Sequence, residues 1–246
     1  MTFSNLPVVD LDELAIAQPT QPTIQTVLDD DGEVSMRAIF VAGVPHGLMT
    51  VFHRAGIPAM EAGYQHGVLH GTMRSYDESG QMLQEAQREA GLAEGVTRTY
   101  YPSGKVMHEQ HYLRGMRNGA SLAFAESGEI SMRSNYTAGR LEGEVSYFNE
   151  GRLVLRERYL GGLLDGDVST YSPSGAVVQS SCYRANLLHG LMKLFWPNGT
   201  LMEERTYRNG KPVGQTRRFD ASGHEIASTN ASAGFMKSFE LLVRGK

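Results

Sequence analysis

The stretch GVTRTYYPSGKVMHEQHYLRGMRNG, residues 95–119, decides the fold. It begins and ends on a glycine, and the same glycine recurs along the chain: Gly47, Gly71, Gly95, Gly119, Gly143, Gly166, Gly190 and Gly214. The intervals are 24 residues, except for one of 23 between Gly143 and Gly166. A fixed period of this size indicates a repeat protein, in which an extended surface replaces a single active-site cleft.

Each unit has the pattern of a β-hairpin. An aromatic residue stands five positions after the first glycine of every unit, and most units have a second glycine nine positions after it: Phe52, Tyr76, Tyr100, Phe124, Phe148, Tyr171, Phe195, Phe219; Gly56, Gly80, Gly104, Gly128, Gly175, Gly199, Gly223. Segments such as Pro102-Ser103-Gly104 favour turns, because proline presets φ and glycine accepts the left-handed conformation. A second aromatic follows each turn in six units: Tyr64, Tyr112, Tyr136, Tyr159, Tyr183, Tyr207.

Three units depart from this pattern. The unit that starts at Gly143 has lost one residue before its turn glycine, Gly151. Arg88 replaces the second aromatic of its unit, and Asn186 replaces a glycine, which is a mild change because asparagine also accepts positive φ. We expect the rod to bend or to be specialised at these positions.

The strand after each turn alternates in character, which predicts two different faces. Two residues past the turn glycine lies an apolar column, and five residues past it a mostly charged column: Val34, Met82, Val106, Ile130, Leu153, Val177, Leu201; Arg37, Glu61, Glu85, Glu109, Arg133, Arg156, Glu204. Successive side chains of a strand point to opposite faces. The sequence therefore predicts one face that is apolar and aromatic and another that is charged.

The predicted fold is all-β: an elongated, single-layer antiparallel meander of about eight or nine hairpin repeats. Isolated hairpins are unstable in water, whereas stacked hairpins pair edge to edge. We expect an acidic N-terminal tail over residues 1–22, repeats over 23–226 and a C-terminal cap over 227–246. Within that cap, Phe235, Phe239 and Leu242 have helical spacing, which predicts a short helix that caps the last hairpin or binds a partner.

The unit resembles the MORN repeat, and it is most similar to the bacterial variant found in YwqK-type antitoxin proteins. The pattern G-x4-Y-x3-G-x7-Y-x2-G-x3-G is clearest over residues 95–119 and 190–214, and the pairs His46-Gly47, His70-Gly71 and His189-Gly190 resemble the family's repeat boundary. The resemblance covers about residues 24–226. It implies a meandering antiparallel sheet, no intrinsic catalysis and use as a binding module that often neutralises a toxin.

Composition excludes several other classes of protein. The N-terminal seven residues lack the basic and apolar regions of a signal peptide, and no stretch approaches the roughly 20 apolar residues of a membrane span. Cys182 is the single cysteine, so the chain forms no internal disulfide, and we expect a cytoplasmic protein. Residues 1–36 carry seven acidic and no basic side chains, which suits either a solvated tail or a basic partner. The absence of a basic stripe argues against nucleic acid.

No candidate for metal binding or catalysis survives the repeat geometry. His108 and His111 point to opposite faces of one strand, so they cannot share a metal. His46 and His70 are two strands apart, about 9.5 Å, which is too far for a common zinc ion. The serines lack a nucleophile elbow, and Cys182 has no predicted base beside it. We therefore expect no enzyme activity, no cofactor and no metal.

Partner-binding candidates remain on the surface. The charged column is acidic at Glu61, Glu85 and Glu109 and basic at Arg133 and Arg156, an arrangement that suits an oppositely patterned protein. Tyr101 and Trp196 are aromatic at the tips of their turns, where they would either anchor an interface or stack on the next unit.

We predict a non-enzymatic binding protein, namely a cytoplasmic antitoxin or immunity protein that neutralises a cognate toxin or secreted effector. The alternative is a MORN-type scaffold or membrane-peripheral tether. A third class, a catalytic β-solenoid, would need convergent titratable groups, which the sequence does not place together.

Overall fold

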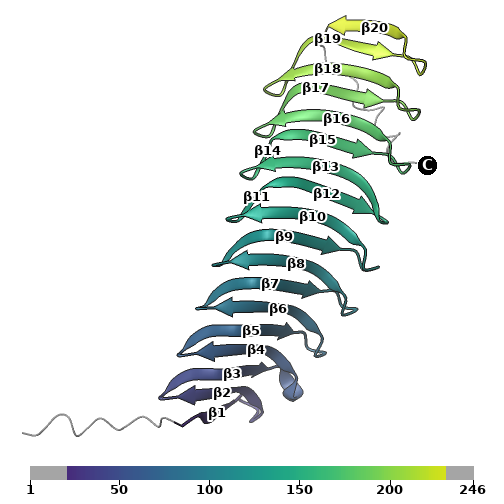
Figure 1. Cartoon of the computed structure of the whole chain (residues 1–246). Coiled ribbons are helices and arrows are strands. Elements are labelled where there is room, and N and C mark those ends of the chain that lie inside the picture. The colour runs from purple at the N-terminus through teal and green to yellow at the C-terminus, as the bar shows by residue number, and fades with distance from the viewer. Residues whose placement is uncertain (1–20, 231–246) are drawn as a thin grey trace, which may run out of the picture.

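The computed structural model describes residues 21–230 and shows one open sheet of antiparallel strands (Figure 1). The strands pair in chain order, and where a two-residue strand intervenes, the strands on either side of it pair with each other. The described strands are β1 Thr23–Leu28, β2 Val34–Val41, β3 Val44–Phe52, β4 Pro58–Gln65, β5 Val68–Tyr76, β6 Met82–Glu89, β7 Leu92–Tyr100, β8 Val106–Leu113, β9 Met116–Phe124, β10 Ile130–Thr137, β11 Arg140–Leu141, β12 Gly143–Asn149, β13 Arg152–Leu160, β14 Leu163–Leu164, β15 Gly166–Tyr171, β16 Val177–Arg184, β17 Leu187–Phe195, β18 Leu201–Arg208, β19 Lys211–Phe219 and β20 Glu225–Asn230.

The predicted all-β meander of stacked hairpins is confirmed. Within the described residues a 3₁₀ turn, η2 Arg54–Gly56, is the one helical element. The last strand, β20, continues to Asn230, four residues beyond the predicted end of the repeats. The predicted capping helix, with Phe235, Phe239 and Leu242, lies outside the described residues, as does most of the predicted N-terminal tail.

Two kinds of turn alternate along the two long sides of the rod. Two-residue turns such as Arg114-Gly115, where both residues have positive φ (50° and 80°), join successive units on the left of Figure 1. This combination defines a type I′ turn, whose twist matches that of the flanking strands. The longer turns lie on the right, and in the turn at Tyr101 the Gly104 N–H donates to Tyr101 O and the Tyr101 N–H to Lys105 O.

The predicted division of the two faces is wrong in one respect, and β-bulges are the reason. Tyr100 pairs with Val106, while its neighbour Thr99 pairs with His108, so Met107 is an extra residue. Directly opposed residues share a face, and Tyr100 shares the face of Arg98 and Glu109. The bulge therefore places Val106, opposite Tyr100, on that face as well. The same register shift recurs at Tyr76, Tyr171 and Phe195.

One face, here called the charged face, thus carries the charged column together with the apolar column and the first aromatic of each unit. The other, here called the small-residue face, carries the second aromatics and a column of small buried side chains. Ala62 is fully buried there between Met60 and Tyr64 of its own strand, and it pairs with Met49 and Met73 of the neighbouring strands. Ala38, Ala86, Ser134 and Ser181 occupy the equivalent position.

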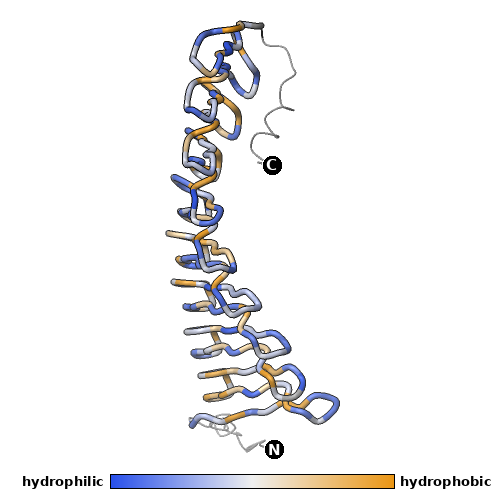
Figure 2. Tube along the Cα trace, turned by 90° about the vertical axis from the view of Figure 1, so that its right-hand side faces the viewer, coloured by the Kyte–Doolittle hydropathy of each residue, from blue (hydrophilic) through white to orange (hydrophobic). Residues whose placement is uncertain are grey.

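Small side chains supply the core because the sheet is a single layer with bowed strands (Figure 1). No second layer packs against it within the described residues, so rows of longer side chains must cover the short ones. Polar and apolar residues alternate at every level of the rod (Figure 2). The small-residue face therefore stabilises the sheet, and the charged face and the turns carry most of the surface that a partner can meet.

Candidate binding surface

The charged column forms a ladder of alternating charges rather than a free acidic strip. Along the charged face, Arg74 stands between Glu61 and Glu85, and Arg98 stands between Glu85 and Glu109. Arg74 Nη2 is 2.9 Å from Glu85 Oε1, and Arg98 Nε is 2.8 Å from Glu109 Oε2. The three predicted glutamates therefore already have partners within the sheet, because Glu61 accepts a hydrogen bond from Tyr76 Oη at 2.8 Å.

These contacts shift the titration of the groups involved. Burial and the hydrogen bond to Glu61 raise the pKa of Tyr76 to about 12. The hydrogen bonds to Glu85 and Glu109 raise the pKa values of Arg74 and Arg98. With three glutamates and two arginines, the ladder has a formal net charge of −1, and its charged groups are paired within the sheet or bonded to Tyr76.

The basic half of the column differs from the acidic half. Arg133 is exposed, and it pairs with Leu122 on one side and Ser146 on the other. Arg156 contacts Glu144 at 3.8 Å and stacks its guanidinium 5.6 Å from the Tyr171 ring centroid. The partner-binding role of Glu61, Glu85, Glu109, Arg133 and Arg156 stays a prediction.

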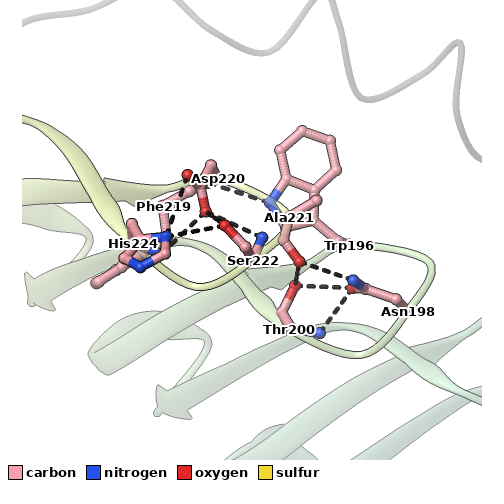
Figure 3. Close-up of polar contacts among 8 residues, drawn as sticks. All are labelled: Trp196, Asn198, Thr200, Phe219, Asp220, Ala221, Ser222 and His224. Carbon is pink, nitrogen blue, oxygen red and sulfur yellow. Dashed lines mark hydrogen bonds and ion pairs between the residues drawn. The ribbon is translucent and has the colours of Figure 1, made fainter.

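The tip aromatics Tyr101 and Trp196 connect neighbouring units. Tyr101 Oη donates to Phe124 O at 2.7 Å, and Trp196 Nε1 donates to Phe219 O at 3.1 Å (Figure 3). His53 Nε2 lies 3.1 Å from Tyr76 O in the equivalent arrangement. Both tip aromatics therefore contact the next unit, which is one of the two roles expected for them. Their role in partner binding stays a prediction.

A different surface was missed by the sequence reasoning. The first residue after the type I′ turn is apolar in six units, and its exposed fraction lies between 42% and 51%: Val44, Val68, Leu92, Met116, Leu163, Leu187. We call this set the turn-edge row. It runs along the edge of the charged face, and Arg140 interrupts it in the unit between Met116 and Leu163. The 24-residue spacing of these apolar residues is visible in the sequence. It does not by itself predict an exposed row, because single exposed apolar residues are common on protein surfaces.

The histidines at unit boundaries act in turn formation. His46 Nδ1 accepts a hydrogen bond from the His66 N–H at 3.4 Å. Glu94 Oε2 and Asp165 Oδ2 accept the equivalent N–H groups at 2.8 and 3.1 Å. The residue before the unit glycine therefore caps the next turn at His46, Glu94 and Asp165, whereas His189 Nδ1 lies 3.2 Å from Asn209 Oδ1.

The described residues contain no group of three or more His, Cys, Asp or Glu side chains arranged to hold a metal ion. His108 bonds to Thr99 Oγ1 on the small-residue face, whereas His111 lies 4.0 Å from Glu109 on the charged face. Burial and the neighbouring Asp167 raise the pKa of the Cys182 thiol, which reduces its nucleophilic thiolate form. Over residues 21–230, no helix has the length and apolar character needed to cross a bilayer.

Three segments of the chain, residues 69–89, 93–113 and 188–209, match the model of the MORN repeat variant. No curated protein matches the chain. Similar solved structures include the GtfA/B complex, at 12% identity over 44% of this chain and 19% of that one, with a TM-score of 0.25.

Two structures of TarM also have a TM-score of 0.25. One is a mutant of S. aureus TarM in complex with fondaparinux, alpha-GlcNAc-glycerol and UDP, at 10% identity over 58% of this chain and 21% of that one. The other is at 11% identity over 53% and 21%. This chain spans about a fifth of the length of these proteins, and at such scores the likeness assigns it neither fold nor activity. The matched segments correspond to the hairpins β5–β6, β7–β8 and β17–β18, so the chain contains MORN repeats of the variant type.

Proposed function

We propose that this chain is a non-enzymatic protein-binding module, and that it acts in the cytoplasm as an antitoxin or immunity protein. It would neutralise a cognate bacterial toxin or secreted effector by binding it directly along the rod. The observation that carries the proposal is the turn-edge row. The antitoxin assignment itself rests on the resemblance of the repeats to the YwqK-type variant.

The size of the row supports a protein partner. Equivalent positions in successive units are two strands apart, about 9.6 Å, so Val44 and Leu187 are separated by roughly 60 Å. Contiguous exposed apolar surface on a soluble protein marks an interaction site. A standard interface buries about 800 Å² on each partner, which a protein lying along three or four units would cover. Each half-exposed leucine would then lose its remaining contact with water.

The ladder of paired charges supports the same use. Because Arg74, Glu85, Arg98 and Glu109 are already matched to one another, a partner that covers them leaves no charge without its pair. The apolar row beside the ladder would supply affinity, and the exposed Arg133 would favour an acidic group of the partner.

A scaffold or membrane-peripheral tether is the second candidate, and the same row favours it, since exposed apolar side chains also insert into lipid interfaces. The net charge of −4 gives no attraction to anionic lipids. Flotation with vesicles of neutral and anionic lipid separates the two. Binding to vesicles that the double variant Leu92→Glu/Met116→Glu abolishes would favour the tether.

The direct test is to identify the proteins encoded next to this chain's gene and to co-express this chain with any toxin-like protein among them. We expect the wild-type chain to relieve growth arrest and to co-purify with the toxin. Leu92→Glu/Met116→Glu should weaken the complex at least 100-fold. Leu83→Glu is the matched control, because Leu83 is similarly exposed (45%) but lies next to a longer turn, and it should leave binding unchanged.

Growth arrest that persists despite a soluble, folded chain would refute the immunity assignment. Equal binding by the double variant and the control would refute the role of the turn-edge row.

A further inference from the structure

The shortened unit creates a feature that the other units lack. Between the paired residues Asn149 and Arg152 the chain turns through Glu150 and Gly151 alone, with φ values of 50° and 70°. The corresponding turns of the neighbouring units have one more residue, at the tip. At the position of Tyr101 and Trp196, directly after the first aromatic residue, this unit has Asn149, whose side chain makes no hydrogen bond to the next unit among the described residues.

At two of the longer turns, the tip residue bonds to the backbone of the next unit. At the Tyr101 turn, the hydroxyl of Tyr101 reaches Phe124 O, and Lys105 Nζ reaches Glu126 O at 2.8 Å. At the Trp196 turn, the indole reaches Phe219 O, while Asn198 and Thr200 both donate to Ala221 O (Figure 3). At these two turns, side chains of one turn thus occupy the space between it and the turn of the next unit.

At the shortened turn this space is open. A cavity of about 390 Å³ lies between the start of β13 and the turn that follows β15. Its lining consists of Arg152, Leu153, Tyr171, Pro173, Ser174 and Gly175. We call it the notch. Its volume is near the lower limit for small-ligand sites, which suits one or two side chains of a bound protein rather than a cofactor.

The chemistry of the lining is specific. Tyr171, Leu153 and Pro173 provide an aromatic and apolar wall. The guanidinium of Arg156 lies 5.6 Å from the Tyr171 centroid, and Arg152 is exposed at the rim. Arg152 has no carboxylate within 4.0 Å among the described residues, although Glu150 is near in sequence and Glu129 lies beside Gly151.

We propose that the notch is a docking site for a protein partner that presents an aromatic side chain next to a carboxylate. The aromatic ring would pack on Tyr171 and Pro173, and the carboxylate would accept hydrogen bonds from Arg152 in the bidentate geometry that guanidinium favours. Buried aromatic anchors of this kind dominate binding energy in interfaces. This inference rests on the proposed function, because it requires that the chain binds a protein.

The first experiment probes the notch without the partner. Acetyl-Asp-Phe-amide is titrated into ¹⁵N-labelled full-length protein, with acetyl-Asn-Phe-amide and acetyl-Asp-Ala-amide as comparison peptides. We expect shifts confined to amides near Arg152 and residues 171–176, and at least tenfold weaker binding of both comparison peptides. Arg152→Gln should weaken binding of the acidic peptide about tenfold, while Arg37→Gln, which changes an exposed arginine of the same face far from the notch, should have no effect.

The second experiment closes the notch. Replacing Asn149-Glu150 by the tripeptide Tyr-Pro-Ser, as found at residues 101–103, restores the 24-residue spacing and supplies a tip. The refilled variant should keep its thermal stability and lose peptide binding. It should also bind the partner at least tenfold more weakly.

The outcomes separate the two proposals. Equal binding of the peptide and the partner by the refilled variant would overturn the notch but leave the binding module intact, since that depends on Leu92 and Met116. Peptide binding in the notch, combined with no binding of the neighbouring toxin, would support the notch and refute the antitoxin function.

Discussion

At the scale of single residues, the rod is held together by contacts that skip from one unit to the next. Tyr101, Trp196 and His53 each reach a backbone carbonyl 23 residues further along the chain. The glycine N–H groups of the type I′ turns do the same in the opposite direction, as when Gly115 donates to Ala93 O. These contacts add to the strand ladders and make each unit depend on its neighbours.

The tyrosine hydroxyl at the tip should have a measurable effect on stability. Tyr101→Phe removes the hydrogen bond to Phe124 O and should lower the free energy of unfolding by about 1 kcal/mol. Urea denaturation measures the change. Tyr183→Phe is the control, because its hydroxyl has no hydrogen bond among the described residues. An equal loss in both variants would show that the tip bond does not stabilise the rod.

The carboxylate of Glu157 stands at a position of the small-residue face where five other units have alanine or serine, and it is the one carboxylate at this position in the repeats. It accepts hydrogen bonds from Tyr147 Oη at 3.2 Å and Tyr159 Oη at 3.0 Å. Burial and the bond to Glu157 raise the pKa of Tyr159 to about 12. A raised tyrosine pKa stabilises the folded state fully below the unfolded value near 10, and this stabilisation is lost as the pH rises from about 10 to 12.

Glu157→Gln should therefore lower the pKa of Tyr159 toward 10, because the negative charge that disfavours the phenolate is gone. The remaining burial should keep it above that value. A ¹³C NMR titration of the tyrosine rings follows each phenol separately, and Glu126→Gln, on an exposed turn, is the control. An unchanged Tyr159 titration in the glutamine variant would contradict the assigned cause.

At the scale of elements, the β-bulge explains why the sequence predicts the hairpins but not their faces. The turn glycines and prolines mark the ends of the strands, because their φ requirements are local. Met107 has no local mark that distinguishes an extra residue from a regular one, and it reverses the alternation between Val106 and Glu109, so that Val106 joins Tyr100 on the charged face. Alternation alone predicts that aromatic and charged side chains lie on opposite faces. In the structure they share a face, since Arg156 lies over Tyr171 and Arg217 lies over Phe219.

The candidate surfaces show the same limit. The charged column and the tip aromatics were visible in the sequence, but the arginines that neutralise Glu85 and Glu109 stand in neighbouring strands, and only the register reveals the pairing. The sequence does not predict the turn-edge row, because the exposure of these side chains depends on how far the turn projects from the sheet. The short unit was visible, and the cavity beside it depends on the three-dimensional position of the next turn.

The unit with Arg88 offers a test of how much each second aromatic contributes. Arg88 pairs with Gly71 and Ala93 on the small-residue face, and its buried Nε has no hydrogen-bond partner among the described residues. Arg88→Tyr restores the aromatic of the repeat and removes the unsatisfied donor. We expect a gain of about 1 kcal/mol in the free energy of unfolding, seen as a raised Tm. Arg88→Ala is the comparison, and a more stable alanine variant would show that the aromatic itself adds nothing.

At the scale of the whole molecule, length is the property on which the functional account depends. The hairpins form one continuous sheet from β1 to β20, and successive strands are separated by about 4.8 Å. Because the sheet is a single layer, the turn-edge row, the charge ladder and the notch remain accessible. In a globular protein a second layer would cover one face of the sheet. A partner can therefore contact several units at once, and small contributions from each unit add up.

Small-angle X-ray scattering tests this claim most directly. About 18 strand widths in series give a length on the order of 85 Å, and a rod of that length has a radius of gyration of about 25 Å. We predict that value, with a pair-distance distribution extended to one side. A symmetric distribution with a radius of gyration near 18 Å, the value for a compact chain of 246 residues, would contradict the rod and the binding surfaces that depend on it.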